Sequence, residues 1–88
     1  MKRSAEFIKR KIGTRYVIVA IGKAAKRFAG MISVNGTGAV IWDLLEKDTS
    51  ETEIAAALAS RFEVDSATAE ADVHGFIASL REVGAIVE

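Results

Sequence analysis

The pattern of apolar residues changes once along this chain, and that change constrains the fold more than any other feature. Up to Asn35 the apolar residues form short runs rich in β-branched side chains, which is typical of strands. From Thr37 onward they recur at the three- and four-residue spacing of amphipathic helices. A chain of 88 residues is too short for two cores. We therefore expect one α+β domain over residues 1–88, with strands first and helices second.

Three strands are predicted in the first part. Residues 7–12 and 15–21 are rich in Ile, Val and Tyr, and Gly13 and Thr14 between them supply turn chemistry, so these segments read as a hairpin. Residues 31–34 form a third short run, bounded by Asn35 and Gly36. The three strands should make a small antiparallel sheet that the helices cover on one face.

The second part predicts three helices. The first has Ile41, Trp42 and Leu45 on one stripe, is capped by Asn35 or Thr37, and ends near residue 47. The second starts at a capping box in residues 50–53, and the third is capped by Asp65 or Ser66 and ends at Gly84. The apolar stripes are Ile54, Ala55, Leu58 and Phe62 in the second helix, and Ala69, Val73, Phe76, Ile77, Leu80 and Val83 in the third. Residues 85–87 form either a last strand or a cover for the core.

Charge is divided between the two parts. Residues 1–30 contain nine Lys and Arg against Glu6 alone, a net charge of +8, and residues 31–88 contain three against eleven, a net charge of −8. Either each part solvates its own surface, or the asymmetry steers a partner. The chain has no cysteine, which excludes disulfides and thiolate metal sites. It also has no apolar run long enough for a signal sequence or a membrane span, so we expect a cytoplasmic protein.

Residues 31–42, Met-Ile-Ser-Val-Asn-Gly-Thr-Gly-Ala-Val-Ile-Trp, resemble the signature of the PqqD family, in which a short strand leads into a first helix opened by Asn-x-Thr-Gly-Ala-x-Ile-Trp. The similarity continues through residues 52–54, 62–65 and 71–73 to Phe76, Leu80 and Gly84, and so covers nearly the whole chain. It implies a winged-helix-like fold with a three-stranded antiparallel sheet and three helices. It also implies that the protein is a RiPP recognition element, a non-enzymatic domain that binds the leader of a ribosomally made precursor peptide.

The resemblance implies a site as well. The leader should add as an antiparallel strand along the third strand, in the groove between that strand and the third helix. The residues carried over to this groove are Met31, Ile32, Ser33, Val34, Asp72, Val73, Phe76, Ile77 and Leu80, with the backbone offered by residues 32–34. The partners implied are the precursor leader and a modifying enzyme, either a radical SAM enzyme or a lasso-peptide protease or cyclase. No cofactor is expected.

Several of these residues also fit the core. Val73, Phe76 and Leu80 lie at the centre of the apolar stripe, whereas Asp72 and Ile77 lie on opposite flanks and are the better contact candidates. The sequence does not show which flank faces the strand. Trp42 reads as a core residue.

Catalysis and nucleic-acid binding are less well supported. His74 is the lone histidine and projects away from the apolar stripe, and the carboxylates lie near helix ends, so neither an acid/base pair nor a metal site is predicted. A winged-helix-like domain that regulates transcription or binds nucleic acid is the alternative function. The third helix, however, has four acidic residues and one basic residue between positions 65 and 83, where DNA binding needs a basic face.

Two further expectations concern association. A free edge strand can pair with a second copy, so a dimer or a strand-swapped dimer would compete with leader binding, although a monomer is the default expectation. Lys26 and Arg27 precede the third strand and are candidates for steering an acidic stretch of leader to it.

Overall fold

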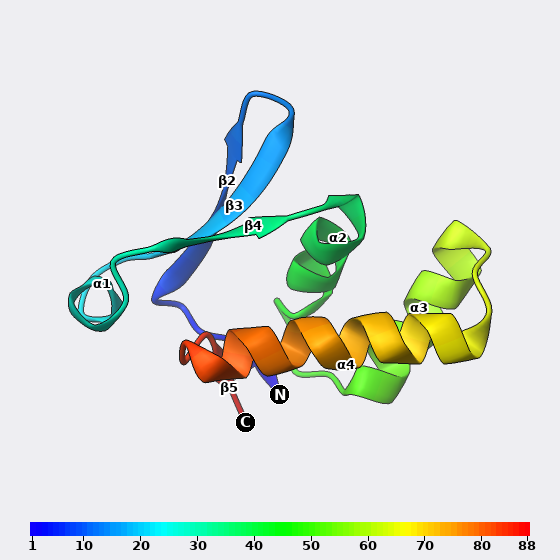
Figure 1. Cartoon of the computed structure of the whole chain (residues 1–88). Helices are drawn as coiled ribbons and strands as arrows, with labels where there is room; N and C mark the ends of the chain where they lie inside the picture. The colour runs from blue at the N-terminus through cyan, green and yellow to red at the C-terminus, as the bar shows by residue number, and fades with distance from the viewer.

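The computed structural model describes all 88 residues and confirms an α+β chain in which a three-stranded antiparallel sheet precedes three long helices. The strands of this sheet are β2 (Phe7–Ile12), β3 (Arg15–Ala20) and β4 (Met31–Val34). The long helices are α2 (Gly36–Leu44), α3 (Glu51–Phe62) and α4 (Ser66–Glu82). In Figure 1 the β2–β3 hairpin rises from one side of the molecule, and α4 runs below β4 in the opposite direction.

Three short elements complete the fold, and two of them, α1 and β1, were not predicted. The one-turn helix α1 (Ala24–Arg27) lies in the link between β3 and β4. The two-residue strands β1 (Lys2–Arg3) and β5 (Ile86–Val87) pair with each other, which makes residues 86–87 a strand as well as a cover for the core. Figure 1 shows that this pairing brings the two chain ends together. Elements of two to four residues are too short to show a periodic pattern, so they depend on contacts distant in sequence.

Local side-chain chemistry accounts for the helix boundaries. The Asn35, Ser50 and Asp65 side chains each accept a hydrogen bond from a backbone N–H three residues on, and so cap α2, α3 and α4. This decides for Asn35 and Asp65 where the sequence left two candidates each. At the end of α4, Gly84 adopts a φ of 80°. Its N–H donates to the Arg81 carbonyl and the next N–H donates to the Leu80 carbonyl, which is a Schellman ending. The end of α2 was placed too late: the helix stops at Leu44 because its last carbonyls are satisfied in a tight turn.

The core lies between the sheet and the helices. Ile18 of β3, Trp42 of α2 and Leu58 of α3 are all at most 2% exposed, so Trp42 has the core role expected of it. The stripe predicted for α3 extends one residue too far, because Phe62 is 42% exposed at the end of the helix. No helix of the chain is long and apolar enough to cross a membrane.

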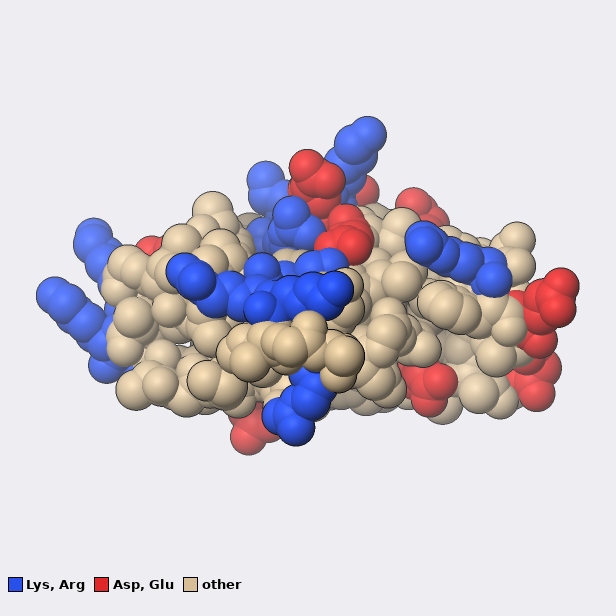
Figure 2. Space-filling view, turned by 90° about the horizontal axis from the view of Figure 1, so that it is seen from above, with Lys and Arg blue, Asp and Glu red and all other residues tan.

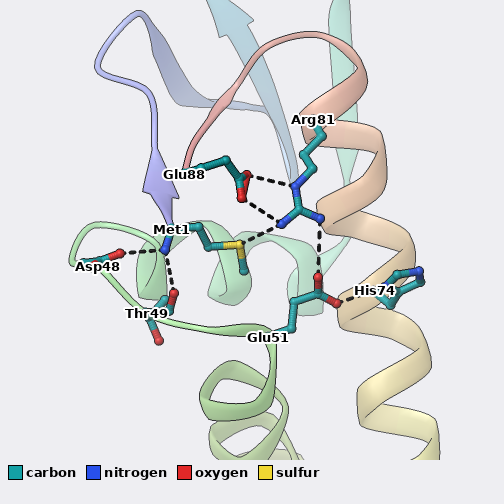
Figure 3. A network of polar contacts seen from close by, with 7 residues as sticks. All are labelled: Met1, Asp48, Thr49, Glu51, His74, Arg81 and Glu88. Carbon is teal, nitrogen blue, oxygen red and sulfur yellow. Dashed lines mark hydrogen bonds and ion pairs between the residues drawn. The ribbon is translucent and has the colours of Figure 1, made fainter.

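A polar network on the side of α4 that faces away from β4 joins this helix to both chain ends (Figure 3). The Arg81 guanidinium donates to both carboxylate oxygens of Glu88, at 3.0 and 3.1 Å, and this pairing lowers the pKa of Glu88. Arg81 also donates to Glu51, which His74 approaches at 3.0 Å. The amino group of Met1 lies 2.6 Å from Asp48. The one basic residue of α4, Arg81, is therefore engaged on this side of the helix, away from β4.

Candidate functional site

The outer side of β4 is an open edge, because the sheet order is β2-β3-β4 and no strand pairs beyond β4. One hydrogen bond fixes which backbone groups face this edge. The Ile21 N–H donates to the Glu6 carbonyl at 2.7 Å, in register with the β2–β3 pairing. Hydrogen-bonded and non-bonded pairs alternate along antiparallel strands, so this bond sets the alternation for the whole sheet.

Carried across to β4, the alternation directs the N–H and C=O groups of Ile32 and Val34 to β3, and those of Met31 and Ser33 to the open edge. This corrects the expectation that residues 32–34 all offer their backbone. A further strand along β4 would bond to Met31 and Ser33. Both of these side chains are exposed, whereas Val34 is 8% exposed and belongs to the core.

A pocket of about 290 Å³ continues the β4 edge beyond Val34. The start of α2 forms one wall and one flank of α4 forms the other. The lining residues are Asn35, Thr37, Gly38, Ile41, Asp72, Gly75, Phe76 and Ser79. Of these, the sequence had pointed to Asp72 and Phe76 as contacts. The others went unrecognised, although a glycine such as Gly75 inside a helix was a visible signal of a special position.

Gly38 holds the two walls close together. A Cβ atom added to it would lie 3.2 Å from the Val34 Cβ and 3.4 Å from the Phe76 ring. The Val34 distance is shorter than an ordinary van der Waals contact and the Phe76 distance is at its lower limit, so a Cβ atom here would require Val34 to move by a few tenths of an ångström. The glycine therefore lets the end of the edge strand, the start of α2 and the middle of α4 meet at the pocket.

The structure corrects the placement of the α4 residues. Val73, Ile77 and Leu80 are completely buried, so Ile77 is a core residue and not the flank contact that the sequence predicts. Phe76, placed at the centre of the stripe, is only partly buried and lines the pocket. The buried stripe is rotated toward Ile77 because that side of α4 packs on α3.

Asp72 lies on the flank of α4 that faces the pocket. Its side chain is exposed, and none of the ion pairs in the chain involves it. The sequence did not show which flank of α4 faces the third strand. In the structure it is the flank with Asp72, Phe76 and Ser79. On the opposite flank, Glu70 borders a crevice between α3 and α4.

The charged side chains are unevenly distributed along the molecule. Figure 2 shows Lys and Arg side chains gathered over the centre and the α1 end of the face seen from above, with acidic side chains among the central ones, and mainly acidic side chains at the end where α3 turns into α4. Lys26 and Arg27 lie in α1, and Arg27 is 3.4 Å from Glu6 in a pair whose members are both well exposed. Lys26 has no partner within the chain, so it is the freer of the two charges.

The histidine considered for other chemistry lies away from this site. His74 is 74% exposed and contacts Glu51 on the far side of α4. The chain has no cluster of three or more His, Asp or Glu side chains placed to hold a metal ion.

Comparisons with known proteins bear on the fold and the family of this chain. TbiB1 in complex with the TbiA(beta) leader peptide is similar to this chain at 26% identity, with a TM-score of 0.71 over 93% of this chain and 90% of that chain. Lasso peptide synthetase B1 complexed with the leader peptide has a TM-score of 0.74 over 99% of this chain and 96% of that one, and at 24% identity it supports the fold alone. No curated relative matches at a significant level. The family model of coenzyme PQQ synthesis protein D (PqqD) matches residues 15–86, which is most of the chain, and the chain therefore belongs to the PqqD family.

Proposed function

We propose that this chain binds the leader segment of a ribosomally synthesised precursor peptide and presents it to a modifying enzyme in the cytoplasm. The leader adds to the sheet as an antiparallel strand beside β4 and continues into the pocket between α2 and α4. The observation that carries the proposal is the open β4 edge, where the backbone groups of Met31 and Ser33 have no partner strand beside a pocket. The similarity to TbiB1 in complex with a leader peptide supports it.

The role of the chain is binding, not catalysis. Backbone pairing supplies affinity for an extended peptide, and the pocket supplies selectivity for its side chains. Because the flexible leader must be ordered on binding, we expect a dissociation constant in the micromolar range, which corresponds to a binding free energy of about 7 to 8 kcal/mol in favour of the complex. The chemistry belongs to the partner, such as a radical SAM enzyme or a lasso-peptide protease or cyclase.

Nucleic-acid binding through α4 is the weaker candidate. The one basic residue of that helix, Arg81, is engaged by Glu51 and Glu88, and no free cation remains on α4 to displace the counterions of DNA.

Amide shifts in the ¹⁵N-labelled protein test the proposal. The probe is a synthetic peptide that covers the leader of the precursor encoded beside this chain. We expect saturable shifts at Met31 and Ser33, whose N–H groups face the open edge, and little change at Lys9 and Lys11 on β2. A peptide that binds with shifts confined to β2 or to the α3 face of α4 would contradict strand addition at β4.

A further inference from the structure

The pocket beyond Val34 is lined mainly by polar residues and glycines, with two hydrophobic residues and a single charged group. Ile41, 1% exposed, and the ring of Phe76 form its apolar part. Asp72 is the only charged residue among the eight that line it, and its carboxylate has no partner within the chain. The pocket thus places the partly exposed Phe76 ring near an unneutralised negative charge.

Lys and Arg side chains match such a surface, because each has a hydrocarbon stem that packs on apolar groups and a cationic end. An aromatic ring near the cation adds a favourable contact with the ring face. The N-terminus of α2 also borders the pocket and carries about half a positive charge, which is smaller than the full charge of Asp72. Part of that helix end is already satisfied, since the Asn35 side chain accepts the Gly38 N–H at 2.8 Å. The one full charge that lines the pocket is therefore negative, which favours a cationic partner.

The direction of the added strand determines where in the leader sequence this cationic residue lies. An antiparallel strand beside β4 runs from the Val34 end toward the Met31 end. The pocket begins at Asn35, just beyond Val34, so it receives a residue that comes before the paired segment, by roughly one to three positions at the rise of a strand.

We propose that Asp72 determines specificity for a Lys or Arg side chain that precedes the β4-paired segment of the leader. This inference rests on the proposed function and adds the chemical class of side chain that the pocket selects. Its chemistry is a charge-assisted hydrogen bond from the ammonium or guanidinium group to the Asp72 carboxylate.

Selection from a display library of random 20-residue peptides tests this inference without knowledge of the natural leader. Three proteins serve as bait: the wild type, Asp72→Lys and Glu70→Lys. Glu70 is the matched control, because it lies two residues away on the same helix but borders the α3 crevice on the opposite flank. We expect the wild type and Glu70→Lys to enrich Lys or Arg at one fixed position before an extended apolar segment. We expect Asp72→Lys to enrich Asp or Glu at that position.

A double-mutant cycle then isolates the contact. Replacing the selected Lys by Gln in one such peptide should weaken binding to the wild type about threefold to tenfold, as for a partly solvated charge pair. The same replacement should have almost no effect on binding to Asp72→Asn.

The outcomes separate this inference from the proposed function. Peptides that shift the Met31 and Ser33 amides but show no charge preference, or an unchanged preference with Asp72→Lys, overturn the role of Asp72 and leave strand addition intact. A selection whose binders never shift those amides contradicts strand addition at β4 and this inference with it.

Discussion

The sheet has two free edges, β2 and β4, and they are built differently. On β2 the outward backbone groups belong to Phe7, Lys9 and Lys11. The Phe7 N–H already donates to Ser4, and the Lys9 side chain crosses the core face of the sheet to reach Asp43 at 2.8 Å. Inward-pointing and flanking lysines are a known protection of edge strands against further pairing.

The β4 edge lacks this protection. Its four residues, Met-Ile-Ser-Val, carry no charge, and the edge leads directly into the pocket between α2 and α4. A small protein that exposes an unprotected edge risks pairing with a second copy. The two edges of one sheet therefore differ in function: charge protects β2 against pairing with another strand, whereas β4 can still accept one.

Proline substitutions at equivalent positions give the sharpest test of this contrast. Ser33→Pro removes an N–H that faces the open edge of β4, and Lys11→Pro removes one that faces the open edge of β2. Neither change costs a bond within the sheet, since edge strands tolerate proline at such positions. We expect Ser33→Pro to weaken leader binding about 10- to 100-fold, because a leader carbonyl loses its donor and the ring blocks close approach. Lys11→Pro should leave it nearly unchanged.

Fluorescence anisotropy with a labelled leader measures both dissociation constants, and thermal melts confirm that both variants fold. Light scattering shows whether the unliganded proteins are monomers. Equal losses of affinity in the two variants would mean that the edges are not distinct in function.

The next test separates the β4 edge from the pocket that follows it. Gly75 lies inside α4, and a Cβ atom added to it meets nothing within 4 Å, so Gly75→Ala should raise the free energy of unfolding by up to about 1 kcal/mol. Gly75→Leu also has room on the helix but projects into the pocket, and we expect it to weaken leader binding about fivefold to tenfold. Ala71→Leu, exposed on the same helix and outside the pocket, is the control.

Chemical denaturation gives the stabilities, and calorimetric titration gives the affinities. Full affinity in Gly75→Leu would show that the leader ends at β4 and does not enter the pocket.

The same two regions show what sequence reasoning reaches and where it stops. The caps at Asn35, Ser50 and Asp65 were predictable, because each depends on residues three positions apart. Periodicity also located the buried side of α4 to within one helical flank. It could not tell Phe76 from Ile77, since which neighbour packs against α3 and which borders the pocket depends on how the helices are placed.

The backbone groups of β4 show a second limit. A shift of one residue in the register exchanges inward and outward groups, so the assignment of Met31 and Ser33 needed the pairing itself. The pocket could not be predicted for a similar reason. Asn35 and Ser79 are 44 positions apart, and only the packing around Gly38 brings their elements together.

The smallest expected effect concerns charge near the start of β4. Lys26 and Arg27 lie in α1, at the Met31 end of the edge, and an antiparallel leader passes them after its paired segment. Both are exposed, so a contact with an acidic leader residue is worth only about 0.2 to 1 kcal/mol each. Charges of this kind act mainly on encounter. We expect the double change Lys26→Gln and Arg27→Gln to lower the association rate about threefold at low salt, with dissociation nearly unchanged.

Stopped-flow fluorescence measures both rates, and Arg10→Gln with Lys11→Gln on β2 is the control of equal charge. If the α1 charges steer the leader locally, the β2 pair should have a smaller effect than the α1 pair. The difference between wild type and the α1 variant should shrink near 1 M salt, where the screening length falls to about 3 Å. Equal association rates for wild type and the α1 variant at low salt would show that Lys26 and Arg27 do not steer the leader and only keep a basic surface solvated. Equal losses from both pairs would instead show that the whole basic face attracts the leader, with no preference for the β4 end.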